Sequence, residues 1–350
     1  DSVAAPGTAV AMQITATASA TFVAGNDVVG VGNNLPLLLD LFNGDNATGV
    51  RSTASGDLNG ITGNVTGAND GRQLVVTTVA NTTFLGDVTG NTFRGEGAGA
   101  VNRREGVVMS FTDRPTAAGF DSFNLLFDNN TVDGNRRGGV DISMLNTAVG
   151  AMTITNNVIT NTEDALANTP DGILITLDGT SVTQQATNLL RKSFISNNTI
   201  GQTLAGGVAA NGGNGVSIVA RELSEIQDLQ IRNNTIANSG ASAISVLRED
   251  EARFTTVNPE ADQTRAVTIA DNQTQGNTFH GLVIDARNGS TDILDFEVRD
   301  NFIGNNLQTG LHLIARADAR LLVDITNNRI LNNASDGIEL ETFQNTTSDK

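Results

Sequence analysis

The chain has 350 residues, a net charge of −17, no cysteine, no tryptophan and no tyrosine. The lack of cysteine excludes disulfides, and the negative charge argues against binding to nucleic acid or to an anionic membrane surface. No apolar run reaches the roughly 18 residues of a membrane-spanning helix, so we expect no membrane insertion. Sugar-binding clefts usually stack rings on Trp or Tyr, so this composition also counts against a glycan-processing groove.

Residues 1–25 are predicted to form one long strand, because apolar and polar residues alternate from Val10 onward. The apolar face of this candidate assembly strand comprises Val10, Met12, Ile14, Ala16, Ala18, Ala20 and Phe22. Three arrangements are open. The strand folds back over its own coil, or it acts as a donor strand on the open sheet edge of a neighbouring subunit, or it is disordered behind the Pro6-Gly7 hinge.

Residues 26–57 are expected to cap the coil that follows. The most apolar run of the chain, NNLPLLLDLF at 33–42, lies here. Asn34 followed by Pro36 resembles a helix start, so we favour a short capping helix over a strand. Such a helix would shield the first turn of the coil from water.

Residues 58–343 repeat one unit. Its anchor is an asparagine with an apolar residue three positions before it and usually another two positions after it. A glycine or alanine follows nine positions later in the shortest units, and the shortest period is 27 residues. The clear anchors are Asn91, Asn130, Asn157, Asn198, Asn234, Asn272, Asn301 and Asn328. A fixed period of this length is typical of a solenoid.

Each unit contains about three short runs with alternating apolar residues, which favours strands over helices. Stacking the units in register predicts an all-β parallel coil of about nine rungs, followed by a tail at 344–350. The anchors would form an Asn ladder, because Asn tolerates the left-handed turn conformation and stacked amides hydrogen-bond along a column.

The NNTI and NxGI patterns of these units resemble the right-handed parallel β-helix superfamily of pectate-lyase-like proteins. The resemblance covers roughly residues 58–343 and implies a single-stranded, right-handed parallel β-helix. It says little about function, because this fold hosts lyases, hydrolases, adhesins and surface fibres alike. In the lyase branch, the resemblance implies calcium on an aspartate cluster, and no such cluster recurs on adjacent rungs here.

His312 and Glu339 each lie two residues after a repeat glycine, so they should be neighbours on adjacent rungs. They form a candidate acid/base pair, weighed against a chance pair in a solvated column. Glu341 is the only further carboxylate close to Glu339, on its own strand, and His280 at a turn is expected to be structural. We expect no cofactor and no metal. Calcium at the acidic loops stays open, although the chain has no EF-hand loop.

Four arginines follow the repeat glycine or alanine by five or six residues on successive rungs: Arg221, Arg248, Arg287 and Arg316. Acids follow closely, so the column is either a salt-bridged corner or a ladder that binds an anionic polymer. Other N-x-[ST] asparagines are anchors of the repeat or lie next to one. Five are not, and these are the candidate glycosylation sites: Asn46, Asn81, Asn288, Asn333 and Asn345.

These features favour a non-enzymatic, extracellular structural protein, secreted or on the cell surface. Its partner would be itself, in a filament or surface fibre built by end-to-end stacking or by strand donation, with glycans as further ligands. Two alternatives stay open: a polysaccharide lyase, hydrolase or carbohydrate-binding β-helix protein, and a passenger segment of a larger adhesin.

Overall fold

The computed structural model describes residues 10–14, 21–24, 27–29, 37–41, 59–62, 65–69, 73–78, 84–95, 105–114, 121–135, 137–160, 162, 170–179, 188–201, 211–287 and 293–343. Every named element within them is a β-strand. In this part of the chain, no helix is long and apolar enough to cross a membrane.

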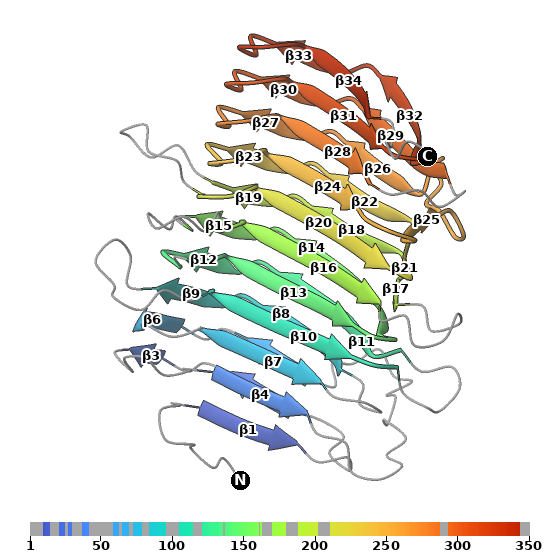
Figure 1. The fold of residues 1–350 in the computed structure, drawn as a ribbon. Helices are drawn as coiled ribbons and strands as arrows, with labels where there is room; N and C mark the ends of the chain where they lie inside the picture. Colours follow the sequence, from blue (N-terminus) through green and yellow to red (C-terminus); the bar gives the residue numbers. More distant parts are fainter. Residues whose placement is uncertain are drawn as a thin grey trace, which may run out of the picture.

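The strands stack into three sheets that run along one elongated body, from the N-terminal end to the C-terminal end (Figure 1). The first sheet contains, in spatial order, β1 (Val10–Ile14), β4 (Leu37–Leu41), β7 (Leu74–Thr78), β10 (Val107–Thr112), β13 (Val140–Leu145), β16 (Ile173–Gly179), β20 (Val216–Glu222), β24 (Ile244–Arg248), β28 (Leu282–Ala286), β31 (Leu311–Arg316) and β34 (Ile338–Phe343).

The second sheet contains β2 (Thr21–Ala24), β5 (Asn59–Thr62), β8 (Phe84–Thr89), β11 (Phe123–Asp128), β14 (Val149–Thr155), β18 (Ser193–Ser196), β22 (Leu229–Arg232), β26 (Val267–Ala270), β29 (Ile293–Arg299) and β32 (Arg320–Thr326). Three further short strands belong to this sheet: β17 (Asn188–Leu190), β21 (Ser224–Gln227) and β25 (Arg253–Thr255). β17 pairs with β14 and β21, and β21 pairs with β25.

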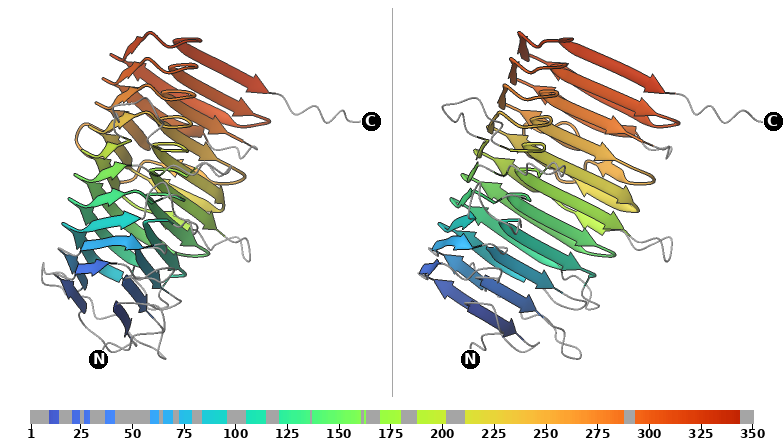
Figure 2. Two further views of the ribbon diagram at one scale, coloured as in Figure 1. Left: turned by 90° about the vertical axis from the view of Figure 1, so that its left-hand side faces the viewer. Right: turned by 60° about the vertical axis from the view of Figure 1, so that its left-hand side comes forward.

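The third sheet contains β3 (Asp27–Val29), β6 (Val65–Asn69), β9 (Thr92–Gly95), β12 (Thr131–Asp133), β15 (Val158–Thr160), β19 (Thr199–Ile200), β23 (Thr235–Ala237), β27 (Gln273–Gln275), β30 (Phe302–Gly304) and β33 (Arg329–Leu331). All of these pairings are parallel. The views in Figure 2 show the sheets as separate walls of one coil. This topology confirms the predicted all-β parallel β-helix.

The core consists of columns of apolar side chains that point into the coil. Val140, Ile142 and Met144 of β13 are all buried, and their register partners on β10 and β16 are buried too. Alternation places every second residue of a strand inward, and the constant register stacks each inward residue on its counterpart in the next rung. The periodic pattern of the sequence therefore becomes a continuous core.

The prediction of one long strand over residues 1–25 is wrong. Val10, Met12 and Ile14 lie in β1 of the first sheet, whereas Phe22 lies in β2 of the second sheet. Each has its own parallel partner, since β1 pairs with β4 and β2 pairs with β5. Ala16, Ala18 and Ala20 lie outside the described residues. An alternating pattern is common to one long strand and to two short ones, so it could not reveal the change of sheet.

The predicted capping helix is also absent from the described residues, and β4 stands in its place. Leu37 and Leu39 are in register with Leu74 and Val76, which are both buried. The run alternates in the same way as the strands that follow, so its backbone pairs in register with β7. The first sheet therefore holds eleven strands, more than the nine rungs expected, because the segment predicted as an assembly strand contributes β1 and the segment predicted as a cap contributes β4.

The C-terminal rung, formed by β32, β33 and β34, differs from those before it. Ile338 and Leu340 of β34 are 51% and 67% exposed. Their register partners on β31, Leu311 and Leu313, are 0% and 5% exposed. Side chains that belong to the core columns therefore face solvent at this end of the coil.

Candidate functional site

The anchor asparagines form a continuous ladder. From Asn91 to Asn301, the backbone N–H and side-chain Nδ2 of each anchor donate to Oδ1 of the anchor in the next rung, at 2.9–3.1 Å. Its members are Asn91, Asn130, Asn157, Asn198, Asn234, Asn272, Asn301 and Asn328. All but Asn328 are almost fully buried. The ladder pairs polar groups that the coil would otherwise bury without partners.

The left-handed conformation belongs to a different residue from the one expected. It occurs at the residue directly before the anchor, for example at Asn156 (φ 55°), Asn233 (φ 54°) and Asp300 (φ 56°). The two residues of the pair therefore have different roles. The first residue makes the turn, and the second places its amide in the ladder.

A second polar column, five residues after the anchors, was missed in the sequence. Nδ2 of Asn277 donates to Oδ1 of Asn306 at 2.7 Å, and Nδ2 of Asn306 donates to Oδ1 of Asn333 at 2.8 Å. Earlier rungs place Ser239 and Thr162 at the same offset, and Ser239 N–H donates to Asn277 Oδ1. The recurring offset of five residues was the signal. Changes of residue type concealed it, and so did an insertion, because Asn211 takes this place in the rung of Asn198.

This second column changes the interpretation of the glycosylation candidates. The Nδ2 atom of Asn333, to which a glycan would be attached, lies 3.4 Å from the Ile303 carbonyl oxygen, and Oδ1 accepts from Asn306. Asn333 therefore serves as the end of a structural ladder, which disfavours it as an acceptor. Asn46, Asn81, Asn288 and Asn345 lie outside the described residues, so they stay predictions.

Three of the four predicted arginines form a network of ion pairs at the corner of the first sheet. Arg221 lies 2.7 Å from Glu249, and Arg287 bridges Glu249 at 3.1 Å and Asp285 at 2.8 Å. Arg316 continues the network through Asp285 at 3.0 Å. The guanidinium groups thus have carboxylate partners within the coil, which favours the salt-bridged corner over a ladder for an anionic polymer.

Arg248 is not part of that corner. It is 1% exposed, its register partners are Ala220 and Ala286, and its Nε donates to the Ala252 carbonyl oxygen at 2.9 Å. It follows its repeat alanine by five residues, whereas the other three arginines follow their glycine by six. A difference of one residue moves a side chain to the opposite face of a strand. Arg248 therefore cannot bind an external ligand in this conformation.

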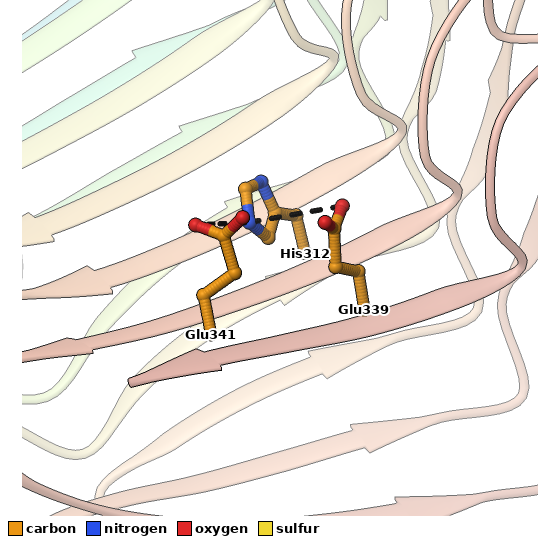
Figure 3. Close-up of side chains that lie close together, drawn as sticks. All are labelled: His312, Glu339 and Glu341. Carbon is orange, nitrogen blue, oxygen red and sulfur yellow. Dashed lines mark ion pairs between the residues drawn. The ribbon is translucent and has the colours of Figure 1, made fainter. Parts of the chain in front are cut away.

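His312 and Glu339 are register partners on β31 and β34. Nε2 of His312 lies 3.9 Å from Oε2 of Glu339 and 3.4 Å from Oε2 of Glu341. Figure 3 shows the imidazole between the two carboxylates. Both glutamates project from the same face of β34 because they are two residues apart. The catalytic role of the pair stays a prediction, and the geometry adds Glu341 to it.

The other ring nitrogen of His312 faces a second histidine. Nδ1 of His312 lies 3.4 Å from Nε2 of His280, and the ring centroids are 4.7 Å apart. Burial lowers the pKa of His280, and the neighbouring His312 lowers it further. A neutral His280 can therefore accept a hydrogen bond from His312 and orient its ring.

Glu339 is held as a carboxylate. Its Oε2 accepts a hydrogen bond from the Thr309 hydroxyl at 2.8 Å, and this bond lowers the pKa of Glu339, with His312 adding to the effect. A general acid must carry a proton near the working pH, so a lowered pKa makes Glu339 a poor proton donor. The cluster is better suited to holding positive charge than to delivering a proton.

No protein-family model and no curated protein matches the chain. Among solved structures, it is similar to the A-module of mannuronan C-5 epimerase AlgE4 from Azotobacter vinelandii, at 12% identity over 98% of this chain and 90% of that one, with a TM-score of 0.29. It is also similar to the surface protein and adhesin PfbA of Streptococcus pneumoniae, at 9% identity over 90% and 91% of the two chains, with a TM-score of 0.22. Similarity at this level carries no argument about activity. The chain's own strand pairing identifies it as a parallel β-helix.

Proposed function

We propose that this protein is a structural subunit whose coils stack end to end into an extracellular filament or surface fibre. The observation that supports the proposal is the exposure of Ile338 and Leu340, which occupy core columns yet are 51% and 67% exposed. Fully burying a side chain of this size stabilises a protein by roughly 1.5–3 kcal/mol. A rung that covers β34 would recover the part of this free energy that belongs to the exposed half or more of each side chain.

The backbone at the same end supports the same partner. β34, β32 and β33 are the last strands in the three sheet orders, so each has one edge without a paired strand among the described residues. Open edges of this kind bind further strands. A parallel rung with matching columns would fit them best.

The other end of the same coil offers such a rung. β1, β2 and β3 are the first strands in the same three sheets, and each is paired on one side only within the described part. A second copy can therefore place its β1, β2 and β3 on β34, β32 and β33 with every strand parallel. This contact joins two different surfaces, so it does not close on itself and propagates into a fibre. Strand donation by residues 1–25 is not part of the proposal, because β1 and β2 have partners in their own coil.

Electron microscopy and sedimentation velocity of the 350-residue chain test the stacking. We expect rods longer than one coil, in amounts that rise with protein concentration, and single coils for Leu340→Asp. The control is Leu307→Asp, because Leu307 is 65% exposed but follows β30 in a turn at the side of the coil. A wild-type chain that stays monomeric at high concentration, or equal loss of rods in both variants, would reject the proposal.

A second candidate is an enzyme acting on polysaccharides, favoured only by the proximity of His312 to Glu339. The lowered pKa of Glu339 weakens it, since hydrolysis needs a protonated acid. A panel of uronate and neutral polysaccharides tests it. Product formation that is lost in His312→Ala and Glu339→Gln would support an enzyme, and a null panel would discard this site.

A further inference from the structure

The side chain of His312 carries a buried polar atom without a hydrogen bond. His312 is 9% exposed, and its Nε2 has no hydrogen-bond partner. Leaving such an atom unpaired destabilises the fold. The nearest groups are the carboxylates of Glu339 and Glu341, so a cation placed among them would satisfy all three residues.

Two cations could stand among these groups, a proton on the imidazole or a metal ion. No hydrogen bond joins Nε2 to a carboxylate oxygen, although Oε2 of Glu341 is 3.4 Å away. A metal ion would replace the proton on Nε2 and bind its lone pair.

The distances fit a bound metal ion. Two donors held at about 2.1 Å on a tetrahedral ion lie roughly 3.4 Å apart. Nε2 of His312 lies 3.4 Å and 3.9 Å from the two glutamate oxygens. One ligand atom from each of the three residues falls within 4.8 Å of the other two.

The surroundings of His312 fit a ligand as well. Nδ1 faces Nε2 of His280 at 3.4 Å, so the tautomer with a proton on Nδ1 leaves Nε2 free for a metal. Metal-binding histidines are usually fixed in this way by a hydrogen bond from the second nitrogen. Thr309 holds Glu339 from the other side through a 2.8 Å hydrogen bond.

We propose that His312, Glu339 and Glu341 bind a divalent transition-metal ion on the outer face of β31 and β34. One imidazole and two carboxylates suit zinc and its neighbours in the first transition row, whereas calcium and magnesium prefer oxygen donors alone. Three protein ligands leave a fourth position open for water or an external group. This site does not depend on the stacking proposed above.

Isothermal titration calorimetry of the full chain with zinc chloride tests the site, with calcium chloride as the comparison. We expect one zinc ion per chain and a much weaker calcium response. Removing a ligand in His312→Ala or Glu341→Gln should weaken zinc binding about 100-fold or more, and His280→Ala about 10–100-fold. Cobalt should give visible absorption bands in the wild type and lose them in His312→Ala.

The matched control is Asp336→Asn, which removes an exposed acid near the same strand without changing the three donors. It should bind zinc as the wild type does, and circular dichroism will show which variants fold. Should His312→Ala fail to fold, the surface variant Glu341→Gln decides the question. Equal zinc binding in the wild type and in Glu341→Gln, or loss of binding in Asp336→Asn alone, would overturn the proposal as non-specific attraction to an acidic protein.

Discussion

The interior rungs and the C-terminal rung follow the same sequence pattern, yet their side chains lie in different environments. Leu311 and Leu313 are buried, whereas their register partners Ile338 and Leu340 are more than half exposed. The alternating pattern of each strand therefore decides which way a side chain points, whereas its burial depends on whether another rung lies above it. In a solenoid, each unit contributes only half of every interface.

We expect the largest difference in unfolding free energy between substitutions in an interior rung and in the C-terminal rung when they remove side chains of the core columns. Ile284, Leu313 and Leu340 occupy one column, and Ile284 is 1% exposed. Ile284→Ala should lower the free energy of unfolding by about 3 kcal/mol because it leaves a cavity. Leu340→Ala should lower it by less than about 1 kcal/mol in the monomer, since most of that side chain already meets water.

Urea unfolding of dilute, monomeric protein measures both substitutions. A large loss for Leu340→Ala that appears only at concentrations where rods form would support the stacking. Equal losses under monomeric conditions would contradict the comparison, because the last rung would then be as well covered as the interior.

Substitutions in the Asn ladder should also cost more stability in an interior rung than in the C-terminal rung, with a smaller difference than in the core columns. Oδ1 of Asn234 accepts from the backbone N–H of Asn198 at 3.0 Å, in a buried position. Asn234→Ala leaves that N–H without a partner and should cost about 2–3 kcal/mol. Asn328→Ala deprives the N–H of Asn301 in the same way, but at a part-buried site that water can reach, so the cost should be about 1 kcal/mol.

Thermal and urea unfolding at one pH compare the two ladder variants, and hydrogen exchange at the Asn198 and Asn301 amides locates the effect. Faster exchange confined to the altered rungs is expected. Equal destabilisation by both variants would mean that the ladder is not weaker at its exposed end.

The smallest expected effect is a pH dependence of stability, caused by an acid that precedes a repeat glycine. Burial raises the pKa of the Asp171 carboxyl from 3.8 to about 6, the charge of Asp141 adds to this, and the hydrogen bond from Asn214 N–H at 2.5 Å opposes it. The folded state therefore binds a proton more tightly than the unfolded state. The stabilisation is complete below a pH of about 4 and is lost as the pH rises through about 6.

Between pH values of about 4.5 and 7, this group alone should remove about 2 kcal/mol of stability. Asp171→Asn should abolish that part of the pH dependence, as measured by urea unfolding at the two pH values. Asp336→Asn is the matched control because Asp336 precedes Gly337 in the same way but is exposed. Identical pH profiles for the wild type and Asp171→Asn would show that the carboxyl is not protonated in the folded state.

Some features of the site could be predicted from the sequence because they depend on spacing alone. The equal offsets of His312 and Glu339 from their glycines place them side by side on adjacent strands. The interaction of His312 with His280 could not be predicted, because it joins a strand to a turn of the preceding rung. The inward position of Arg248 was missed because a shift of one residue reverses the face of a strand.

The sequence by itself determined the period, the strand character and the columns of Ile, Val, Leu and Asn, because these follow from repeated local spacing. Only the tertiary structure decided that Val10–Ile14 and Thr21–Ala24 belong to different sheets. It also decided that Leu37–Leu41 is a strand and that Ile338 and Leu340 are exposed. The physical reason is common to all three. Alternation is a local property of the chain, whereas pairing and burial depend on the neighbouring rung.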